Sequence, residues 1–532
     1  MTIVHWLMNM NRKKIKILSL VPCFLLLVFL TGCATTDETE GLYKRLNTQI
    51  TLFLNGPDKV LPDITFELSA INIIEEDGTA REVMNRPIGV NSHIVEGSQI
   101  LLGEKALPEG RYKKLQLIVT EASIRKKGRT AHLALPPEGI EIDIDVSLRK
   151  HQNTTLFLNW NPDASIQEGY MFRPVFSVRS QTPELSSLLI YVTNEDSDNV
   201  SVINRQSGEI AATVMVGKKP RGIATSKNRD RLKVYVANSG SNSISVIDPT
   251  TNKIENEIPI RFGRRPEGIA VAGLSSEEDL LFVANYGSNS VSVVDTTTYQ
   301  ELEKIDVGRG PTAIAVDPSI DELITASFLS FEDINVLRSY RERFLNVYVV
   351  NQDSNDISVL RIDTATKKSV EVMTLGVEWR PVAIYVDYRR GKVYVANYDS
   401  DKLSVIDILQ TVKGNIAGAV SVINNVGFSI TGVVADPAFD RIYLLKESPG
   451  EIIIIKPFSG GFDYLKTVMP PVMGTISVGS SPKSLVMDPE GRKLYVVNRG
   501  SDNISVIDKT AKREERVISV GKRPYGIAVF PK

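Results

Sequence analysis

The sequence contains very little histidine and cysteine. Its 532 residues include four histidines and two cysteines. The histidines stand at positions 5, 93, 132 and 151 and the cysteines at positions 23 and 33, so the chain after His151 contains neither residue. This inventory excludes from the second half of the chain a haem attachment site, a histidine-based copper or zinc site, and any Ser-His-Asp or Cys-His catalytic arrangement.

Composition and charge place the chain among ordinary globular proteins. Hydrophobic residues make up 42% and charged residues 23% of the sequence, values that exclude a disordered or collagen-like chain. The 62 basic and 63 acidic residues give a net charge of −1. No field of the whole molecule therefore attracts nucleic acid, and any electrostatic attraction has to be local.

The first 33 residues predict export and lipid attachment. Four basic residues precede an apolar run from Ile17 to Leu30, which matches a secretory signal and is short for a membrane span. Leu30-Thr31-Gly32-Cys33 then resembles a bacterial lipobox. The resemblance implies that residues 1–32 are a lipoprotein signal peptide and that the Cys33 thiol carries the lipid. Cys23 follows a proline, which does not fit the lipobox pattern. The alternative interpretation of the segment is an anchor helix that is not cleaved.

Cleavage would leave a net charge of −5, because residues 1–32 hold four basic and no acidic residues. Cys33 would be the only remaining cysteine, which excludes disulfides. Residues 33–48 are mostly small, polar or acidic and predict a flexible tether. Ala34 stands where an aspartate signals inner-membrane retention in enteric-type lipoproteins. The resemblance therefore implies a lipid anchor in the outer membrane of a bacterial cell envelope.

The second half of the chain repeats the phrase Tyr-Val-x-Asn at intervals typical of propeller blades. The six matching asparagines are 44, 47, 66, 46 and 101 residues apart, and the longest interval contains a decayed copy at residues 442–446. Each copy is followed by a polar turn and a second β-branched run, which predicts a β-hairpin. The matching copies begin at Tyr191, Tyr235, Phe282, Tyr348, Tyr394 and Tyr495.

A third strand is predicted after a glycine-proline elbow in seven further segments. Proline has a fixed φ and no backbone donor, which suits the start of a strand; Ile430 replaces it in the fifth segment. The first repeat has no such segment before it, and the last segment has no repeat after it. We therefore predict that the C-terminal strand completes the first blade and closes a ring. The segments begin at Gly217, Gly263, Gly308, Gly376, Gly427, Gly479 and Gly521.

These phrases resemble the YVTN-repeat β-propeller family over about residues 188–532. The resemblance implies seven blades, with the Tyr-Val-x-Asn strand second from the channel and with the interblade elbows and polar hairpin turns on one face. An insertion at about residues 319–345 breaks the period. Its apolar spacing and the capping position of Ser330 predict a helix from about Phe331 to Phe344, which either packs on its own propeller or meets a partner.

Residues 49–179 alternate short apolar runs with turn clusters, which predicts an antiparallel β-sandwich of about seven strands. The segments Leu107–Tyr112 and Arg173–Val175 resemble an uncharacterised sandwich domain of bacterial lipoproteins. Residues 180–187 form the predicted linker. The predicted fold class is therefore all-β, a sandwich followed by a seven-bladed propeller that is closed by its first and last strands.

Oxygen-rich hairpins at Asn194 and Asn351 could offer calcium ligands, but neither has the spacing of a calcium loop. Solvated hairpin tips explain them better, and no metal, cofactor or catalytic residue is predicted. Aspartates that recur after strands are interpreted as turn formers, although a carboxylate-based, lactonase-like hydrolase stays open as an alternative. These aspartates include Asp248, Asp295, Asp407 and Asp508.

Basic residues gather at the interblade elbows, where only Glu267 and Glu378 oppose them. They predict a positive mouth beside the channel that captures an anionic group; solvated loop tips are the alternative. An envelope protein, an anionic polysaccharide or single-stranded nucleic acid would fit, although the last needs aromatic stacking, for which Trp379 and Tyr525 give little support. The candidates are Lys218, Lys219, Arg221, Arg264, Arg265, Arg309, Arg380, Lys483, Lys522 and Arg523.

The sequence thus favours a non-catalytic, lipid-anchored binding or scaffold protein of the cell envelope over an enzyme, since a propeller fold by itself licenses no activity. A structural component of a surface layer is a third hypothesis, which predicts self-assembly without a ligand.

Overall fold

The computed structural model describes residues 48–57, 62–84, 86–136, 139–149, 153–181, 188–227, 231–274, 278–317, 329–436, 438–456 and 472–530. The predicted signal peptide, Cys33, almost all of the tether and most of the linker lie outside these residues. Within them, no helix is long and apolar enough to cross a membrane.

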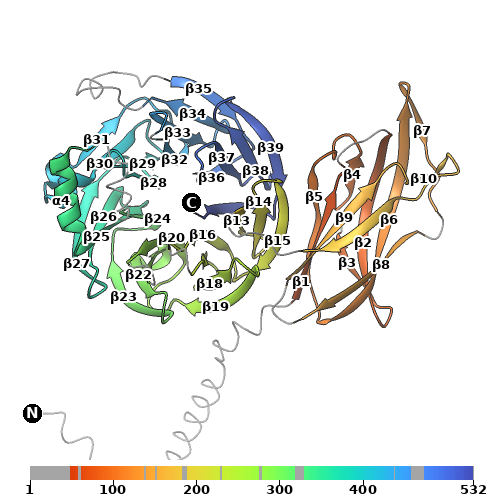
Figure 1. Cartoon of the computed structure of the whole chain (residues 1–532), viewed down its shortest axis with the longest axis horizontal. Coiled ribbons are helices and arrows are strands. Elements are labelled where there is room, and N and C mark those ends of the chain that lie inside the picture. Colours follow the sequence, from red (N-terminus) through yellow and green to blue (C-terminus); the bar gives the residue numbers. More distant parts are fainter. Residues whose placement is uncertain are drawn as a thin grey trace, which may run out of the picture. The chain divides into compact units, whose positions relative to one another are not determined.

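The described residues between 48 and 180 form two large sheets and one two-stranded sheet (Figure 1). The strands are β1 (Thr48–Asn55), β2 (Asp63–Glu75), β3 (Ala80–Met84), β4 (Ile88–Asn91), β5 (Gln99–Leu107), β6 (Gly110–Lys126), β7 (Arg129–His132), β8 (Ile140–Leu148), β9 (Asn153–Asn161), β10 (Ile166–Gln167), β11 (Met171–Phe172) and β12 (Val175–Ser180). One large sheet has the order β12-β9-β1-β5, and the other has the order β3-β2-β6-β7 with β4 on β2 and β8 on β6. Side chains of both sheets, such as Leu52 and Leu117, share one hydrophobic core.

Two features of this front part differ from the sequence-based prediction. It has more strands than seven, because short strands such as β4 and β7 carry too few residues to show a period of two. In addition, β1 pairs with β9 in parallel, so the prediction of a purely antiparallel arrangement is wrong. Alternation along a strand shows which face is buried but not the direction of the partner strand, and the long connection from β1 to β9 permits the parallel arrangement.

From residue 188 onward, the described chain forms seven four-stranded antiparallel sheets around one channel (Figure 1). From the channel outward the blades are β40 (Pro524–Val529), β13 (Leu189–Asn194), β14 (Asn199–Asn204) and β15 (Glu209–Met215); β16 (Pro220–Thr225), β17 (Val234–Asn238), β18 (Ser243–Asp248) and β19 (Lys253–Pro259); β20 (Pro266–Gly273), β21 (Asp279–Asn285), β22 (Ser290–Asp295) and β23 (Gln300–Asp306); β24 (Pro311–Val316), β25 (Phe344–Asn351), β26 (Asp356–Asp363) and β27 (Lys368–Gly376); β28 (Pro381–Asp387), β29 (Lys392–Asn397), β30 (Leu403–Asp407) and β31 (Val420–Ile423); β32 (Ile430–Asp436), β33 (Arg441–Lys446), β34 (Glu451–Ile455) and β35 (Val472–Ser477); β36 (Pro482–Met487), β37 (Lys493–Asn498), β38 (Asn503–Asp508) and β39 (Arg513–Ser519).

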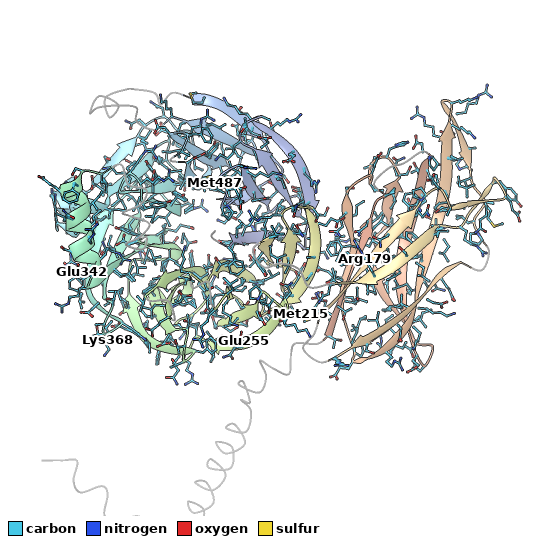
Figure 2. All side chains as sticks on the ribbon, viewed as in Figure 1. Arg179, Met215, Glu255, Glu342, Lys368 and Met487 are labelled. Atoms are coloured by element: carbon cyan, nitrogen blue, oxygen red, sulfur yellow. The ribbon has the colours of Figure 1, made fainter. Side chains whose placement is uncertain are left out.

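The C-terminal strand closes the ring, which confirms the predicted closed, seven-bladed propeller. β40 pairs with β13, and Tyr191 lies opposite Ala528. Neighbouring blades are joined by shared hydrophobic clusters, one of which contains Val246 from one blade and Val283 from the next. Side chains fill the space between neighbouring sheets of the ring (Figure 2). Closure gives the first blade its fourth strand and covers the inner edge of β13.

The asparagine of each Tyr-Val-x-Asn copy holds its own hairpin together. Its Nδ2 donates a hydrogen bond of 2.7–3.0 Å to the serine seven residues later in all six copies. In several blades the elbow glycine has no room for a side chain; a Cβ on Gly263 would overlap the amide of Asn285. The decayed copy has Lys446 and Ile453 at the two hydrogen-bonding positions, and Lys446 pairs with Glu451 instead, at 3.6 Å. The asparagine and the serine seven residues later are therefore either both present in a copy or both replaced.

The inserted helix α4 (Phe331–Arg341) begins where the sequence predicts, and Ser330 Oγ accepts a hydrogen bond of 3.2 Å from the Asp333 N–H. It ends at Arg341 because Phe344 already begins β25. Leu337 is 2% exposed and lies in a core cluster with Tyr348, so the helix packs on its own propeller. The shorter elements are α5 (Ile408–Val412), η2 (Tyr286–Ser288) and η3 (Ile416–Gly418).

The asparagine–serine pair gives a first prediction. Asn285→Ala should lower the free energy of unfolding by about 1–3 kcal/mol, because it leaves the buried Ser292 hydroxyl without its donor. In a double-mutant cycle measured by denaturant unfolding, Asn285→Ala combined with Ser292→Ala should cost less than the sum of the single changes. Strict additivity would contradict the role assigned to this hydrogen bond.

Candidate ligand site at the channel mouth

Each of the seven innermost strands opens with a shift of register. In one blade Pro266 pairs with Asn285 and Gly268 pairs with Ala284, so that Glu267 has no partner residue. The other six innermost strands shift at the same point. Such a β-bulge turns a side chain out of the ladder, and here the second residue of each strand turns into the channel.

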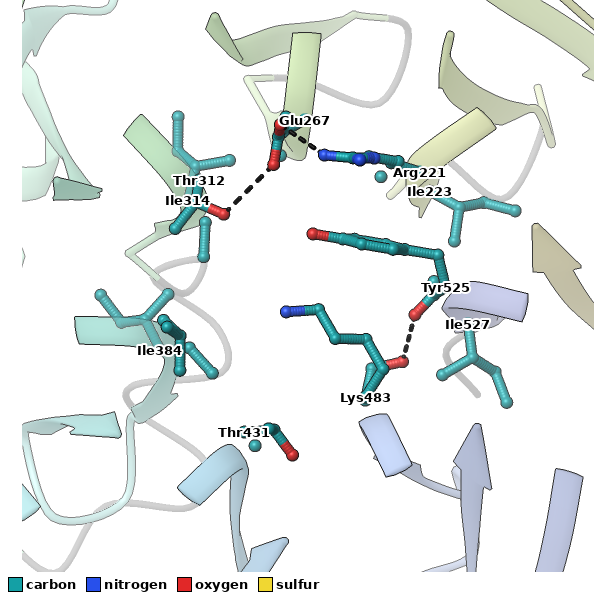
Figure 3. Close-up of a pocket in the computed structure, with 18 of the residues that line it drawn as sticks. Arg221, Ile223, Glu267, Thr312, Ile314, Ile384, Thr431, Lys483, Tyr525 and Ile527 are labelled. Carbon is teal, nitrogen blue, oxygen red and sulfur yellow. Dashed lines mark hydrogen bonds and ion pairs between the residues drawn. The ribbon is translucent and has the colours of Figure 1, made fainter. Parts of the chain in front are cut away.

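The second, third and fourth residues of the innermost strands line a cavity of about 270 Å³ at the channel mouth (Figure 3). The third residues are small, because neighbouring blades approach closely; a Cβ on Gly222 would overlap the backbone carbonyl of Glu267. The fourth residues are all aliphatic, whereas the second residues differ in chemistry. In blade order the second residues are Arg221, Glu267, Thr312, Val382, Thr431, Lys483 and Tyr525, and the fourth are Ile223, Ile269, Ile314, Ile384, Val433, Leu485 and Ile527.

The elbows and hairpin turns lie side by side at this mouth. In all seven elbows the residue before the innermost strand has a left-handed backbone, with φ from 45° to 65°. Its carbonyl oxygen accepts the N–H of the residue that follows the second strand, as Lys219 does from Ser239 at 3.0 Å and Arg523 from Glu195 at 3.1 Å. These bonds place both sets of loops on one face, as the family resemblance implies.

Two buried glutamates at the mouth are held by three arginines. The Glu195 carboxylate, 4% exposed, accepts from Arg221 at 2.7 Å and from Arg499 at 2.6 Å. Glu267, also 4% exposed, binds the other side of Arg221 and pairs with Arg265 at 3.0 Å. Burial raises the pKa of Glu195, but the hydrogen bonds from Arg499 and Arg221 outweigh it and hold this pKa below its ordinary value. The network therefore carries one excess positive charge.

Lys483 and Tyr525 complete the positive side of the cavity. Lys483 Nζ lies 5.0 Å and Arg221 Cζ 5.1 Å from the centroid of the Tyr525 ring, which are cation–π distances. The Lys483 amine and the Tyr525 hydroxyl both point into the cavity (Figure 3). Within the described residues Lys483 forms no ion pair. The mouth thus offers an unpaired ammonium beside a phenol hydroxyl.

The structure brings together only some of the candidate residues. Arg221 and Lys483 line the cavity, and Arg265 reaches it through Glu267. The remaining candidates are exposed on the elbows around the mouth, and no described ion pair connects them with the cavity. They are Lys218, Lys219, Arg264, Arg309, Arg380, Lys522 and Arg523.

The elbows are also less positive than the sequence suggests. Arg523 pairs with Asp196 at 3.4 Å and Arg380 pairs with Asp399 at 3.6 Å. Both acids lie in hairpin turns on the same face as the elbows, so a count of elbow residues alone omits them. Glu378, expected to oppose the elbow cations, pairs with Lys402 at 2.9 Å.

Glu195 and Arg499 were missed by the sequence reasoning, and the direction of Tyr525 was not foreseen. An alignment of the seven innermost segments against one another could have found the ring of second residues. In that alignment the first residue is proline in six segments, the third is small and the fourth is aliphatic, while the second varies. A variable position in an otherwise constant repeat is one that the fold does not fix, so a binding site can be built there.

The recurring aspartates form turns, as interpreted from the sequence. Asp248, Asp295 and Asp508 accept hydrogen bonds of 2.7–2.9 Å from backbone N–H groups two residues later. Asp407 caps α5 by accepting from the Gln410 N–H at 3.1 Å. In the described part of the chain, no three acidic or histidine side chains are grouped as metal ligands would be.

No protein-family model and no curated protein matches the chain. Among solved structures, a functionally unknown protein from Desulfotomaculum acetoxidans resembles it with a TM-score of 0.50 and 11% identity, over 65% of this chain and 100% of that one. Hydrazine synthase from Kuenenia stuttgartiensis gives 0.47 and 18%, over 61% and 93%. A protein from Lactobacillus plantarum gives 0.47 and 14%, over 64% and 98%. At these identities the likeness concerns the fold alone.

A second prediction distinguishes Arg221, which is paired with two buried carboxylates, from Lys483, which forms no described ion pair. Arg221→Met should lower the free energy of unfolding by about 3 kcal/mol, because it leaves two buried carboxylates undercompensated. Lys483→Met should change it by less than about 1 kcal/mol, since Lys483 loses only its contact with Tyr525. Denaturant unfolding of both variants measures the difference, and equal losses would contradict this division of roles.

Proposed function

We propose that the protein is a lipid-anchored, non-catalytic binding protein of the bacterial cell envelope, related to the YVTN-repeat propellers, whose elbow face binds an anionic polysaccharide. The lipobox resemblance at Cys33 supports the anchor and an outer-membrane location. The propeller fold and the charges at its elbows support the binding role.

The observation that carries the binding role is a run of unpaired cations on three consecutive elbows, which we name the basic rim. Lys522, Lys218, Lys219 and Arg264 are exposed, and none forms an ion pair with a described residue. Phe262, two residues before Arg264 in the same elbow, is 56% exposed. A polymer with regularly spaced carboxylates can contact all three elbows at once, and such repeated weak contacts add up to useful affinity.

The third prediction tests the basic rim. The triple variant Lys218→Gln, Arg264→Gln and Lys522→Gln should elute from a polygalacturonate column at lower salt than the unchanged protein, because it loses three of the contacts that salt screens.

The matched control removes three exposed cations from the outer strands instead. The substitutions Lys253→Gln, Lys368→Gln and Arg513→Gln change the net charge equally, and these residues begin β19, β27 and β39, away from the elbows. The control should elute as the unchanged protein does. If both triple variants shift alike, binding follows total charge and the rim has no special role.

The fourth prediction tests the anchor. In a bacterial host fed an alkyne-labelled palmitate, the full-length chain should incorporate the label and fractionate with the outer membrane. Cys33→Ser should abolish labelling because it removes the thiol, whereas Cys23→Ser should be labelled normally. Label retained by the Cys33→Ser variant would disprove lipid attachment at this position.

A further inference from the structure

We propose that the cavity at the channel mouth is a second binding site, which takes a small aliphatic monocarboxylate. Its carboxylate group would lie on Lys483 and Tyr525, and its hydrocarbon chain would lie among the aliphatic fourth residues of the seven innermost strands. This site is separate from the basic rim and does not depend on the rim binding a polymer.

The donors that remain free in the cavity select one carboxylate. The Arg221 guanidinium is occupied by Glu195 and Glu267. The hydroxyl of Thr431 donates to the Pro482 carbonyl oxygen at 2.8 Å. The hydroxyl of Ser484 donates to the Tyr525 carbonyl oxygen at 2.8 Å, and that of Thr312 donates to Glu267 at 3.5 Å. The Lys483 ammonium and the Tyr525 hydroxyl are then left as donors, one for each oxygen of a single carboxylate.

The charge of the mouth favours a monoanion. Lys483 contributes the one cation of the cavity lining that no described carboxylate neutralises. The arginine network also has one excess positive charge, but part of this charge lies on Arg265, which is exposed to solvent. A dianion such as phosphate would therefore keep part of its charge unpaired in a partly desolvated cavity, which is unfavourable.

The lower layer of the cavity selects a hydrocarbon chain. Seven aliphatic side chains, one from each blade, stand at the same register position below the polar ring. Ile314 is 9% and Val433 is 4% exposed. Each methylene that enters such a layer strengthens binding about fourfold. The cavity of about 270 Å³ has room for a short hydrocarbon chain below the carboxylate, and hexanoate carries such a chain.

The fifth prediction uses hexanoate as the probe. Isothermal titration of the full chain in phosphatidylcholine nanodiscs, with empty nanodiscs subtracted, should give a Kd of about 1 mM or lower. Acetate, which lacks the chain, and hexanamide, which lacks the charge, should each bind at least about tenfold more weakly. Failure of hexanoate to bind overturns the proposal. Equal binding of acetate overturns the role of the aliphatic layer, and equal binding of hexanamide overturns the role of Lys483.

Variants assign the site to its residues. Lys483→Met should weaken hexanoate binding about tenfold and Tyr525→Phe severalfold, while Lys483→Arg should restore most of the affinity because it restores the charge. The matched control Lys522→Met removes one cation from an elbow near the cavity and should leave hexanoate binding unchanged.

Two outcomes separate this proposal from the others. If Lys483→Met unfolds like the unchanged protein and still binds hexanoate equally well, the site assignment is wrong. The triple rim variant should bind hexanoate as the unchanged protein does, whether or not it loses retention on polygalacturonate.

Discussion

The pairing of β40 with β13 is the constraint on which the rest of the propeller depends. Residues at the two ends of the repeat region share one sheet there, and the Gly526 N–H donates to Thr193 Oγ1 at 2.8 Å across 333 residues of sequence. Because the circle is closed, no innermost strand can shift outward without breaking contacts with both neighbours. Seven bulges are therefore held around one axis, and their side chains converge although they are far apart in the chain.

Closure also divides the innermost strands into positions that build the ring and positions that are free to vary. The small third residues set how closely the blades approach, since a Cβ on Gly526 would overlap the backbone carbonyl of Arg221. The second residues lie in bulges and take no part in the ladder, so their side chains do not determine strand pairing. One scaffold position per blade can therefore carry arginine, glutamate, threonine, valine, lysine or tyrosine without changing the fold.

The repeats and the complementary ends made the ring predictable, because both depend on spacing along the chain. The Ser330 cap made the start of α4 predictable for the same reason, since its contact spans three residues. The site was less predictable, because its contacts cross the ring. The bond between Glu195 and Arg499 joins residues 304 positions apart, and the direction of Lys483 depends on a bulge that its own segment does not reveal. Counting elbow charges therefore found cations but not their partners.

The front part of the chain meets the propeller at a hairpin that also serves the channel mouth. Glu104 of β5 accepts hydrogen bonds from Ser197 and, at 2.7 Å, from Asn199. Burial raises the pKa of Glu104, and these two hydrogen bonds offset only part of that effect. The same hairpin begins at Glu195, which holds two arginines of the mouth. The hairpin is thus fixed at one end by a half-buried carboxylate of the front part and at the other by the arginine network. The front part therefore helps to keep Glu195, and through it Arg221, in place beside the cavity.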